Sequence, residues 1–220
     1  MEAIRTTKSN NISTLIGYKG SGKTALSEML ILLNNKPAII ADPRLQYPTM
    51  LKRRLFFTSP KKLTLWIKNI DNFKDFYNYK LELVCKVDDE NIEILSKTVY
   101  ELHRITYCVD EVDMFFPTSA TAKNYIYKLV NYGRHNEIDL ITTSRRPANI
   151  NRSLTANTDD FYFAKISEPT DLQYFKNIAG EKYLNEIQLL SRFEFLKYSE
   201  GGNLCKVKTS KSNLELIDGL

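Results

Sequence analysis

The sequence contains no apolar run close to the roughly 18 consecutive residues that a membrane-spanning helix needs. Its polar start, MEAIRTTKSNN, also lacks the apolar stretch typical of a signal peptide. The three cysteines, Cys85, Cys108 and Cys205, are too few and too scattered for a disulfide framework, and no Cys/His spacing is typical of a zinc site. We therefore expect a soluble cytoplasmic protein without a membrane span, a disulfide scaffold or zinc.

Neither sign of charge dominates, since 31 Lys and Arg residues stand against 26 Asp and Glu residues, for a net charge of +5. This balance allows a polyanionic partner without requiring one. Hydrophobic residues make up 43% and charged residues 26%, which is ordinary globular usage and disfavours disorder and coiled coils. No linker-like segment divides the chain, so we expect a single domain over residues 1–220.

Short apolar runs alternate with segments of helical periodicity along most of the chain. The runs have little polar alternation, as expected for strands buried on both faces of a parallel sheet. The pattern predicts an α/β fold with an open, mostly parallel sheet flanked by helices, a core over about 11–166, and a C-terminal extension over about 167–220. Segment 44–58 predicts no clear element. The expected strands are 11–16, 37–41, 81–87, 105–109, 138–143 and 161–166, the expected helices are 24–33, 59–70, 91–103, 119–131, 170–178 and 181–190, and residues 193–208 are expected to form a hairpin.

A glycine-rich segment after the first expected strand matches GxxxxGK[ST], the phosphate-binding loop or Walker A motif. In such a loop the glycines turn backbone N–H groups towards phosphate, and the N-terminus of the following helix adds a favourable dipole. We expect Lys23 to reach the β- and γ-phosphates and Thr24 to offer its hydroxyl group to Mg²⁺. The alternative is a glycine turn that binds no nucleotide. The residues of the motif are Gly17, Tyr18, Lys19, Gly20, Ser21, Gly22, Lys23 and Thr24.

Asp110 and Glu111 directly follow the expected strand at 105–109, which is a Walker B pattern. In a parallel sheet this strand ends beside the phosphate loop. Asp110 is therefore the candidate to hold Mg²⁺ through water, and Glu111 the candidate to orient and deprotonate the attacking water. Asp113 is a competing base, and two solvated acids at a strand end are the alternative. The Asp-Glu pair favours an ATPase coupled to mechanical work over a small-molecule kinase or a GTPase.

Residues 132–147, YGRHNEIDLITTSRRP, combine a Gly-Arg pair, a following strand and a polar-Arg-Pro turn. This stretch resembles the HerA/FtsK superfamily of ring-shaped DNA translocases, and within it the genome-packaging ATPases of icosahedral viruses with an internal membrane. The resemblance covers about 12–180 and implies a P-loop NTPase domain of RecA/FtsK-like fold. It also implies ATP and Mg²⁺, a homohexameric ring, and double-stranded DNA bound without sequence specificity. A capsid-vertex or portal partner, in the host cytoplasm or at the virion vertex, is implied as well.

The resemblance assigns roles to two arginines. Arg134 occupies the position of the arginine that reaches the nucleotide of a neighbouring subunit and stabilises charge on the γ-phosphate. Relatives carry Gln before Arg-Pro as a γ-phosphate sensor, whereas this chain has Arg145 there, preceded by Thr143 and Ser144. The sensor is therefore Arg145, Thr143 or Ser144. A solvated surface position is the alternative for Arg134 and Arg145.

Three basic clusters are candidates for DNA contacts, since a ring multiplies a few cations per subunit around the phosphate backbone. Solvated surface charge is the alternative for each cluster. No signature of sequence-specific recognition is present. The clusters are Lys52, Arg53 and Arg54; Lys61 and Lys62; and Lys206, Lys208 and Lys211.

These observations favour an ATP-driven motor on double-stranded DNA that packages a viral genome. One alternative is a morphogenesis or secretion ATPase that resembles the Zot-like proteins of filamentous phages, which usually add a membrane anchor. Another is a nucleotide-dependent switch or a small-molecule kinase, although no NKxD or LSGGQ-type motif occurs.

Overall fold

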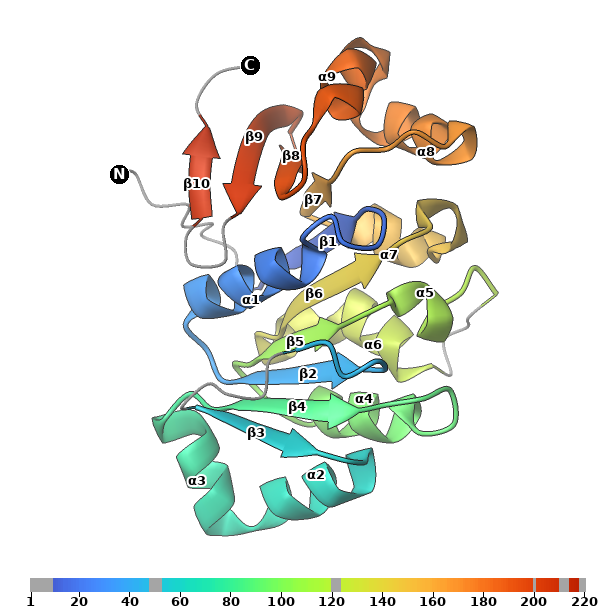
Figure 1. Cartoon of the computed structure of the whole chain (residues 1–220). Helices are drawn as coiled ribbons and strands as arrows, with labels where there is room; N and C mark the ends of the chain where they lie inside the picture. Colours follow the sequence, from blue (N-terminus) through green and yellow to red (C-terminus); the bar gives the residue numbers. More distant parts are fainter. Residues whose placement is uncertain (1–9, 48–52, 120–123, 200, 210–213, 218–220) are drawn as a thin grey trace.

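The computed structural model describes residues 10–47, 53–119, 124–199, 201–209 and 214–217, which form one ten-stranded sheet (Figure 1). Its strands are β1 (Ile12–Ile16), β2 (Ala38–Asp42), β3 (Arg54–Phe57), β4 (Glu82–Lys86), β5 (Thr106–Val109), β6 (Asp139–Ser144), β7 (Asp160–Phe163), β8 (Glu194–Ser199), β9 (Asn203–Thr209) and β10 (Leu214–Ile217). Their order across the sheet is β10-β9-β8-β7-β1-β6-β5-β2-β4-β3. Strands β1 to β7 are parallel, and β8 to β10 extend the sheet in antiparallel fashion.

The central strands β1, β2, β5 and β6 are buried along their whole length. Burial on both faces explains their uninterrupted apolar runs, because neither side of these strands faces water. All six expected strands are present with small shifts at their ends, and the expected hairpin corresponds to β8 and β9. The predicted α/β fold with a mostly parallel sheet is therefore confirmed.

Helices cover both faces of this sheet. The α-helices are α1 (Lys23–Asn34), α2 (Pro60–Lys68), α3 (Ile70–Asn78), α4 (Ile92–Tyr100), α5 (Val112–Phe115), α6 (Tyr125–Tyr132), α7 (Arg152–Asn157), α8 (Pro169–Ala179) and α9 (Leu184–Leu189). Short 3-10 turns are η1 (Gly133–Asn136), η2 (Pro147–Asn149) and η3 (Glu181–Tyr183). None of these described helices is long and apolar enough to cross a membrane.

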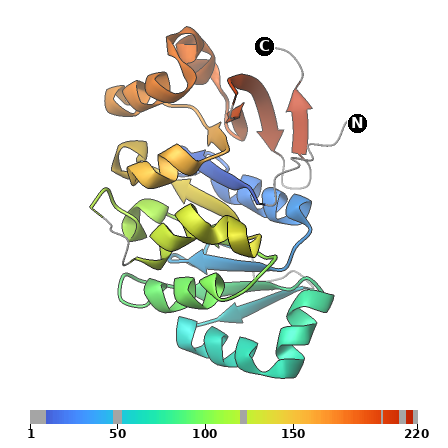
Figure 2. The ribbon, with the colours of Figure 1, turned by 180° about the vertical axis from the view of Figure 1, so that it is seen from behind.

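Helix α1 lies on one face of the sheet, whereas α2, α4, α6 and α7 lie on the other (Figures 1 and 2). The two faces bury separate apolar clusters. Leu26 and Leu30 of α1 pack in the cluster on the first face, and Leu95 of α4 and Leu129 of α6 pack in the larger cluster on the second. With both faces covered, the loops at the carboxyl ends of the strands are left to form a site.

The expected helix at 59–70 is present as α2, and a second helix that was not predicted, α3, follows it directly. Helix α2 ends at Lys68, and α3 begins at Ile70 because the Asn69 side chain accepts hydrogen bonds from the backbone N–H groups of Asp71 and Asn72. An asparagine in this position caps a new helix start. The polar composition of α3 hid it from a search for apolar periodicity.

Segment 44–58, which predicted no element, contains the edge strand β3. The expected helix at 119–131 begins at Tyr125 in the structure, where the Asn124 side chain accepts a hydrogen bond from the N–H group of Tyr127. Residues 120–123 of that expected helix lie outside the described residues. Strand β10, beyond the hairpin, was not predicted.

Candidate functional site

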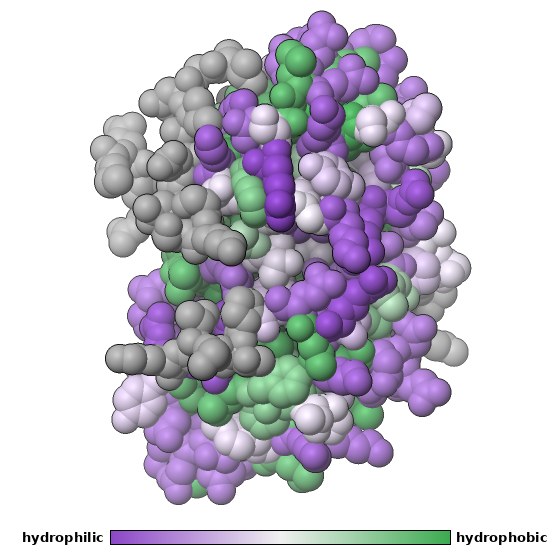
Figure 3. Space-filling view, viewed as in Figure 1, coloured by the Kyte–Doolittle hydropathy of each residue, from purple (hydrophilic) through white to green (hydrophobic). Residues whose placement is uncertain are grey.

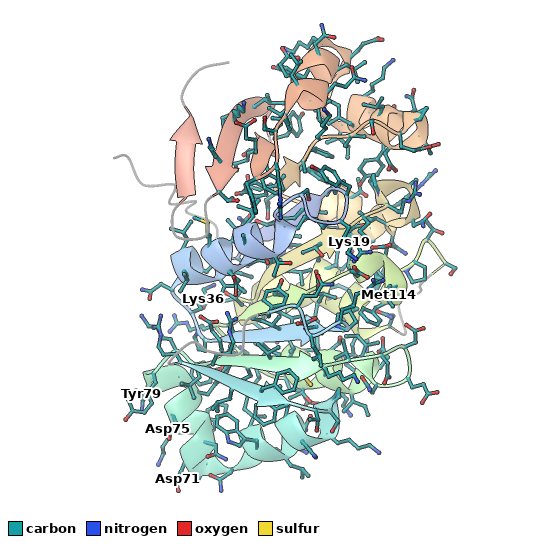
Figure 4. The ribbon with its side chains drawn as sticks, in the orientation of Figure 1. Lys19, Lys36, Asp71, Asp75, Tyr79 and Met114 are labelled. Carbon is teal, nitrogen blue, oxygen red and sulfur yellow. The ribbon has the colours of Figure 1, made fainter. Side chains whose placement is uncertain are left out.

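The phosphate loop and the Asp-Glu pair lie at the same edge of the sheet. Parallel pairing of β1 with β6, and of β6 with β5, brings the carboxyl ends of these strands together, and Gly17 N donates to Ser144 O at 3.1 Å. Lys19 of the phosphate loop and Met114 of α5 mark this edge in Figure 4. Hydrophilic side chains gather over it in the space-filling view (Figure 3). The chain therefore concentrates its candidate chemistry at one edge.

The phosphate loop connects β1 to the N-terminus of α1, as the motif predicts. Gly22 has a φ of 106° just before the helix, a conformation that side-chain-bearing residues rarely adopt. Gly17 leaves no space for a side chain, because a Cβ atom there would lie 2.6 Å from Cβ of Ala164. These constraints explain two of the glycines in the motif by backbone geometry.

Lys23 is buried at the start of α1, with 8% of its surface exposed. Its Nζ donates hydrogen bonds to the carbonyl oxygens of Gly17, at 2.6 Å, and Tyr18, at 3.1 Å. Burial lowers the pKa of Lys23 to about 8, although the neighbouring carboxylate of Asp110 opposes this effect. The ammonium group is thus held at the loop by carbonyl groups in an environment that disfavours its charge.

Asp110 is buried at the end of β5, and only one of its two carboxylate oxygens has a hydrogen-bond partner among the described residues. Its Oδ1 accepts a hydrogen bond of 2.5 Å from the Thr143 hydroxyl group, while its Oδ2 is buried with no partner among the described residues. Burial raises the pKa of Asp110, with a further contribution from the Asp42 carboxylate. A buried carboxylate oxygen in a cavity that Thr24 also lines fits the oxygen-donor chemistry of Mg²⁺. No cluster of three His, Cys, Asp or Glu side chains suited to a metal occurs in the described part of the chain.

Glu111 is held in place from three directions. Its backbone is left-handed, with a φ of 52°, and its N–H group donates to Thr143 Oγ1 at 3.0 Å. Its carboxylate pairs with Arg44, at 2.8 Å between Nε and Oε2, and with Arg145 through the other oxygen. Only 7% of the side chain is exposed. The two arginines therefore fix the orientation of the candidate base.

Arg44 was missed by the sequence analysis. It lies in the loop after β2, where the buried Asp42 carboxylate accepts hydrogen bonds from Arg44 N (3.1 Å) and Tyr47 N (2.9 Å). The Tyr47 hydroxyl group in turn bonds to Ser27 of α1 at 2.7 Å. The one available signal was an aspartate at the end of a buried strand, which in a parallel sheet lies at the edge that carries the site.

A cavity of about 590 Å³ joins these groups. The phosphate loop, Asp110, Glu111 and Arg145 line it, and so do Arg192 and Phe193. The last two precede β8 and were also missed by the sequence analysis. Asp113, the competing base, is in α5 and does not line this cavity.

Arg134 lies far from this site in its own chain. It is exposed in η1, which precedes β6 and hence lies at the opposite edge of the sheet from the phosphate loop. The five residues of β1 separate the two edges by roughly 16 Å. Arg134 therefore cannot contact a nucleotide bound at the phosphate loop of the same chain.

The structure divides the candidate DNA-binding residues. Arg54 is buried and pairs with Glu82, at 2.5 Å, and Glu28, at 2.9 Å, so its expected surface role is wrong: ion pairing with β4 and α1 draws it inwards. Arg53, Lys61, Lys62 and Lys208 are exposed, and Lys206 pairs with Glu194 at 2.9 Å. Lys52 and Lys211 lie outside the described residues.

Several solved structures have this fold. The genome-packaging NTPase B204 of Sulfolobus turreted icosahedral virus 2, in complex with ATP-γS, superposes with a TM-score of 0.72 at 18% identity, over 91% of this chain and 98% of that one. Its sulfate complex gives a TM-score of 0.71 at 17% identity, over 97% and 98% of the two chains. VirB4 of Thermoanaerobacter pseudethanolicus gives a TM-score of 0.66 at 13% identity, over 93% of this chain and 90% of that one.

Sequence comparison adds a shorter match. The zinc import ATP-binding protein ZnuC of Rickettsia bellii is 36% identical over an alignment of 106 residues, and the match covers 41% of this chain and 42% of that protein. The chain thus spans less than half the length of this curated relative, and no family model matches it. The chain therefore has the fold of P-loop NTPases and carries their phosphate-loop motif, and its structural neighbours include the viral genome-packaging NTPase B204.

Proposed function

We propose that the protein is an ATP-hydrolysing motor that translocates double-stranded DNA and packages a viral genome. The observation that carries this proposal is the Asp110–Glu111 pair, which Thr143, Arg44 and Arg145 hold beside the phosphate loop. A water-activating carboxylate fixed at this position suits hydrolysis rather than transfer of phosphate to a small molecule. The likeness of the fold to packaging NTPases supports the choice of motor.

The residues around the loop divide the chemistry between them. Backbone N–H groups of the phosphate loop and Lys23 bind the phosphates, and Thr24 together with Asp110, through water, holds Mg²⁺. When bound, Mg²⁺ neutralises charge on the β- and γ-phosphate oxygens. Glu111 orients the attacking water and accepts its proton.

Among the three candidate γ-phosphate sensors, Arg145 is the one we assign. Thr143 is occupied by Asp110 and Glu111, and the Ser144 hydroxyl group accepts a hydrogen bond from Arg146 N at 3.1 Å. Arg145 follows the end of β6, lines the cavity, and has a guanidinium group with more donors than its pairing with Glu111 uses. Arg145 therefore links the presence of the γ-phosphate to the position of Glu111, the proposed general base.

The exposed Arg134 supports assembly into a ring, with six subunits proposed from the resemblance. Because Arg134 lies at the edge opposite its own phosphate loop, a catalytic role requires a second copy of the chain. In a ring each subunit presents Arg134 to its neighbour's nucleotide, where it stabilises charge on the γ-phosphate. We further propose that the whole chain acts as one ATPase domain at a capsid vertex or portal, in the host cytoplasm or in the virion.

Steady-state ATP hydrolysis with and without long duplex DNA, at two salt concentrations, tests the proposal. Duplex is expected to stimulate hydrolysis, and the stimulation is expected to weaken at the higher salt concentration because phosphate contacts are electrostatic. Lys23→Ala is expected to remove the activity, and Glu111→Gln is expected to leave only a slow residual rate that duplex does not stimulate. Hydrolysis that does not respond to DNA would contradict the motor and point to a protein partner.

A further inference from the structure

The turn formed by Arg192 and Phe193 contacts the phosphate loop from a distant part of the chain. Phe193 N donates a hydrogen bond of 3.0 Å to Ser21 O, and Arg192 Nε donates one of 3.0 Å to Gly20 O. On its other side, Phe193 O accepts a hydrogen bond of 2.9 Å from Thr209 N at the end of β9. The turn is therefore anchored to the sheet and placed directly against the loop.

The backbone of this turn is unusual. Phe193 has a φ of 67°, in the left-handed region that bulky residues rarely occupy. Its ring lies so close to the loop that a Cβ atom at Gly22 would be 2.5 Å from Phe193 Cδ1. Strained backbone positions of this kind cluster at ligand-binding sites, which indicates that the turn contacts a ligand.

The guanidinium group of Arg192 lies over the ring of Phe193. The guanidinium carbon of Arg192 lies 4.7 Å from the centre of the Phe193 ring, which is the geometry of a cation–π contact. Both side chains line the cavity of about 590 Å³, together with Ala25 and Met29 of α1. Flat aromatic and guanidinium groups beside apolar side chains suit the face of a nucleobase, which stacks on such surfaces.

We propose that Arg192 and Phe193 bind the nucleoside part of the nucleotide whose phosphates occupy the phosphate loop. Glu111 and Arg145 line the same cavity as the Arg192–Phe193 turn. A nucleotide whose γ-phosphate lies beside Glu111 can therefore place its nucleobase against the turn. Stacking recognises the large face of a purine rather than the groups at its edge. The inference rests on the proposed nucleotide site, but it requires no role in DNA translocation.

Binding of ATP, ADP and inorganic tripolyphosphate to the full chain, measured by calorimetry, tests this assignment. Phe193→Gly removes the ring, and glycine tolerates the positive φ. We expect this variant to bind ATP and ADP about tenfold more weakly, because a stacked base is lost, and to bind tripolyphosphate as the wild type does. Arg192→Ala, at an exposed position, is expected to weaken ATP and ADP binding in the same selective way. Phe56→Ala, an exposed phenylalanine on β3, is the matched control and is expected to change none of the three affinities.

The other outcomes overturn the inference in distinguishable ways. An equal loss of ATP and tripolyphosphate binding in both variants would show that the turn only supports the phosphate loop. Unchanged ATP binding in both variants would place the base elsewhere. Wild-type protein that binds neither ATP nor tripolyphosphate would overturn the nucleotide site itself, and this inference with it.

Discussion

The Thr143 hydroxyl group donates a hydrogen bond of 2.5 Å to Asp110 Oδ1 and accepts one of 3.0 Å from the backbone N–H group of Glu111. A single side chain of β6 therefore fixes both acids at the end of β5. Thr143 orients Asp110 through a hydrogen bond to the carboxylate, and it orients Glu111 through a hydrogen bond from the backbone N–H group. Loss of a group that orients a metal-binding carboxylate typically lowers metal affinity or activity by about 10- to 100-fold.

Removal of this hydroxyl group is expected to slow hydrolysis. Thr143→Val keeps the shape of the side chain but leaves Asp110 Oδ1 and Glu111 N without their shared partner. We expect kcat to fall by about 10- to 100-fold, with ATP affinity changed less. Thr143→Ser, which keeps the hydroxyl group, is expected to retain most activity. Equal losses in both variants would contradict the hydrogen-bonding role and indicate a packing effect.

Nucleotide affinity is expected to depend on pH through Lys23. Burial lowers the pKa of this lysine to about 8, so the free protein loses the Lys23 charge as the pH rises through 8. Bound phosphates favour the charged form, and binding above pH 8 therefore takes up a proton and weakens by up to about tenfold per pH unit.

Calorimetry of ATP binding at pH 7 and pH 9, in two buffers with different ionisation enthalpies, measures this proton directly. The Lys23→Arg variant keeps its charge at pH 9, so no proton is expected to be taken up at this position when it binds ATP. Wild-type protein that binds ATP at pH 9 without proton uptake would show that Lys23 is already charged in the free protein.

Arg44 is expected to act through Glu111. Arg44→Gln removes one of the two cations that hold the Glu111 carboxylate, and we expect kcat to fall about tenfold with little change in the KM for ATP. In a Glu111→Gln background the same change is expected to cost much less, because its target is gone. Lys176→Gln, which breaks a surface ion pair of α8 with Glu181, is the control. Equal losses in the two backgrounds would mean that Arg44 contacts the nucleotide independently.

Arg134 is expected to complete the site of a neighbouring subunit. Arg134→Ala should abolish hydrolysis and spare ATP binding, because the side chain lies at the opposite edge from its own phosphate loop. Mixing Arg134→Ala with Glu111→Gln subunits should restore part of the activity, since some sites then combine an intact Glu111 with an intact Arg134. Mixed assemblies that stay inactive, with co-assembly confirmed by pull-down of differently tagged subunits, would refute the role between subunits.

The buried Arg54 is expected to matter for stability. Its guanidinium group pairs with Glu82, and the two side chains are 2% and 6% exposed. Glu82→Leu removes the more buried of the two acidic partners that Arg54 has among the described residues and leaves Glu28, so it is expected to lower the free energy of unfolding by about 2 kcal/mol. Glu181→Gln, in an exposed pair, is expected to cost about 0.5 kcal/mol or less. Denaturant unfolding of both variants measures the difference, and equal small losses would contradict a buried pair.

The sheet and the two nucleotide motifs could be predicted because their signals are local. A strand such as Pro37–Ala41 is apolar throughout since both its faces are covered, and the glycines of residues 17–24 reflect backbone geometry within that segment. Arg44, Arg192 and Phe193 carry no such signal. They reach the site only after β2 and β8 have paired in the sheet, so their positions depend on contacts between distant segments.

The choice of a γ-phosphate sensor also depends on contacts between distant segments. Thr143, Ser144 and Arg145 are consecutive residues at one strand end, and the sequence leaves each of them as a candidate γ-phosphate sensor. Their partners in the structure differ: Thr143 binds Asp110 and Glu111, the Ser144 hydroxyl group accepts from Arg146 N, and Arg145 pairs with Glu111. Pattern alone could name the position, but the partners of each side chain were needed to choose among the three.

The placement of Arg134 and the phosphate loop at opposite edges of the sheet gives the molecule a polarity. A symmetric pair related by a two-fold axis would use the same surface of both subunits, whereas joining these two edges requires unlike surfaces to meet. Such head-to-tail contacts have no natural end unless they close on themselves. An open row of subunits would always have one unmatched phosphate loop and one unmatched Arg134 at its ends, and only closure gives every copy an identical environment.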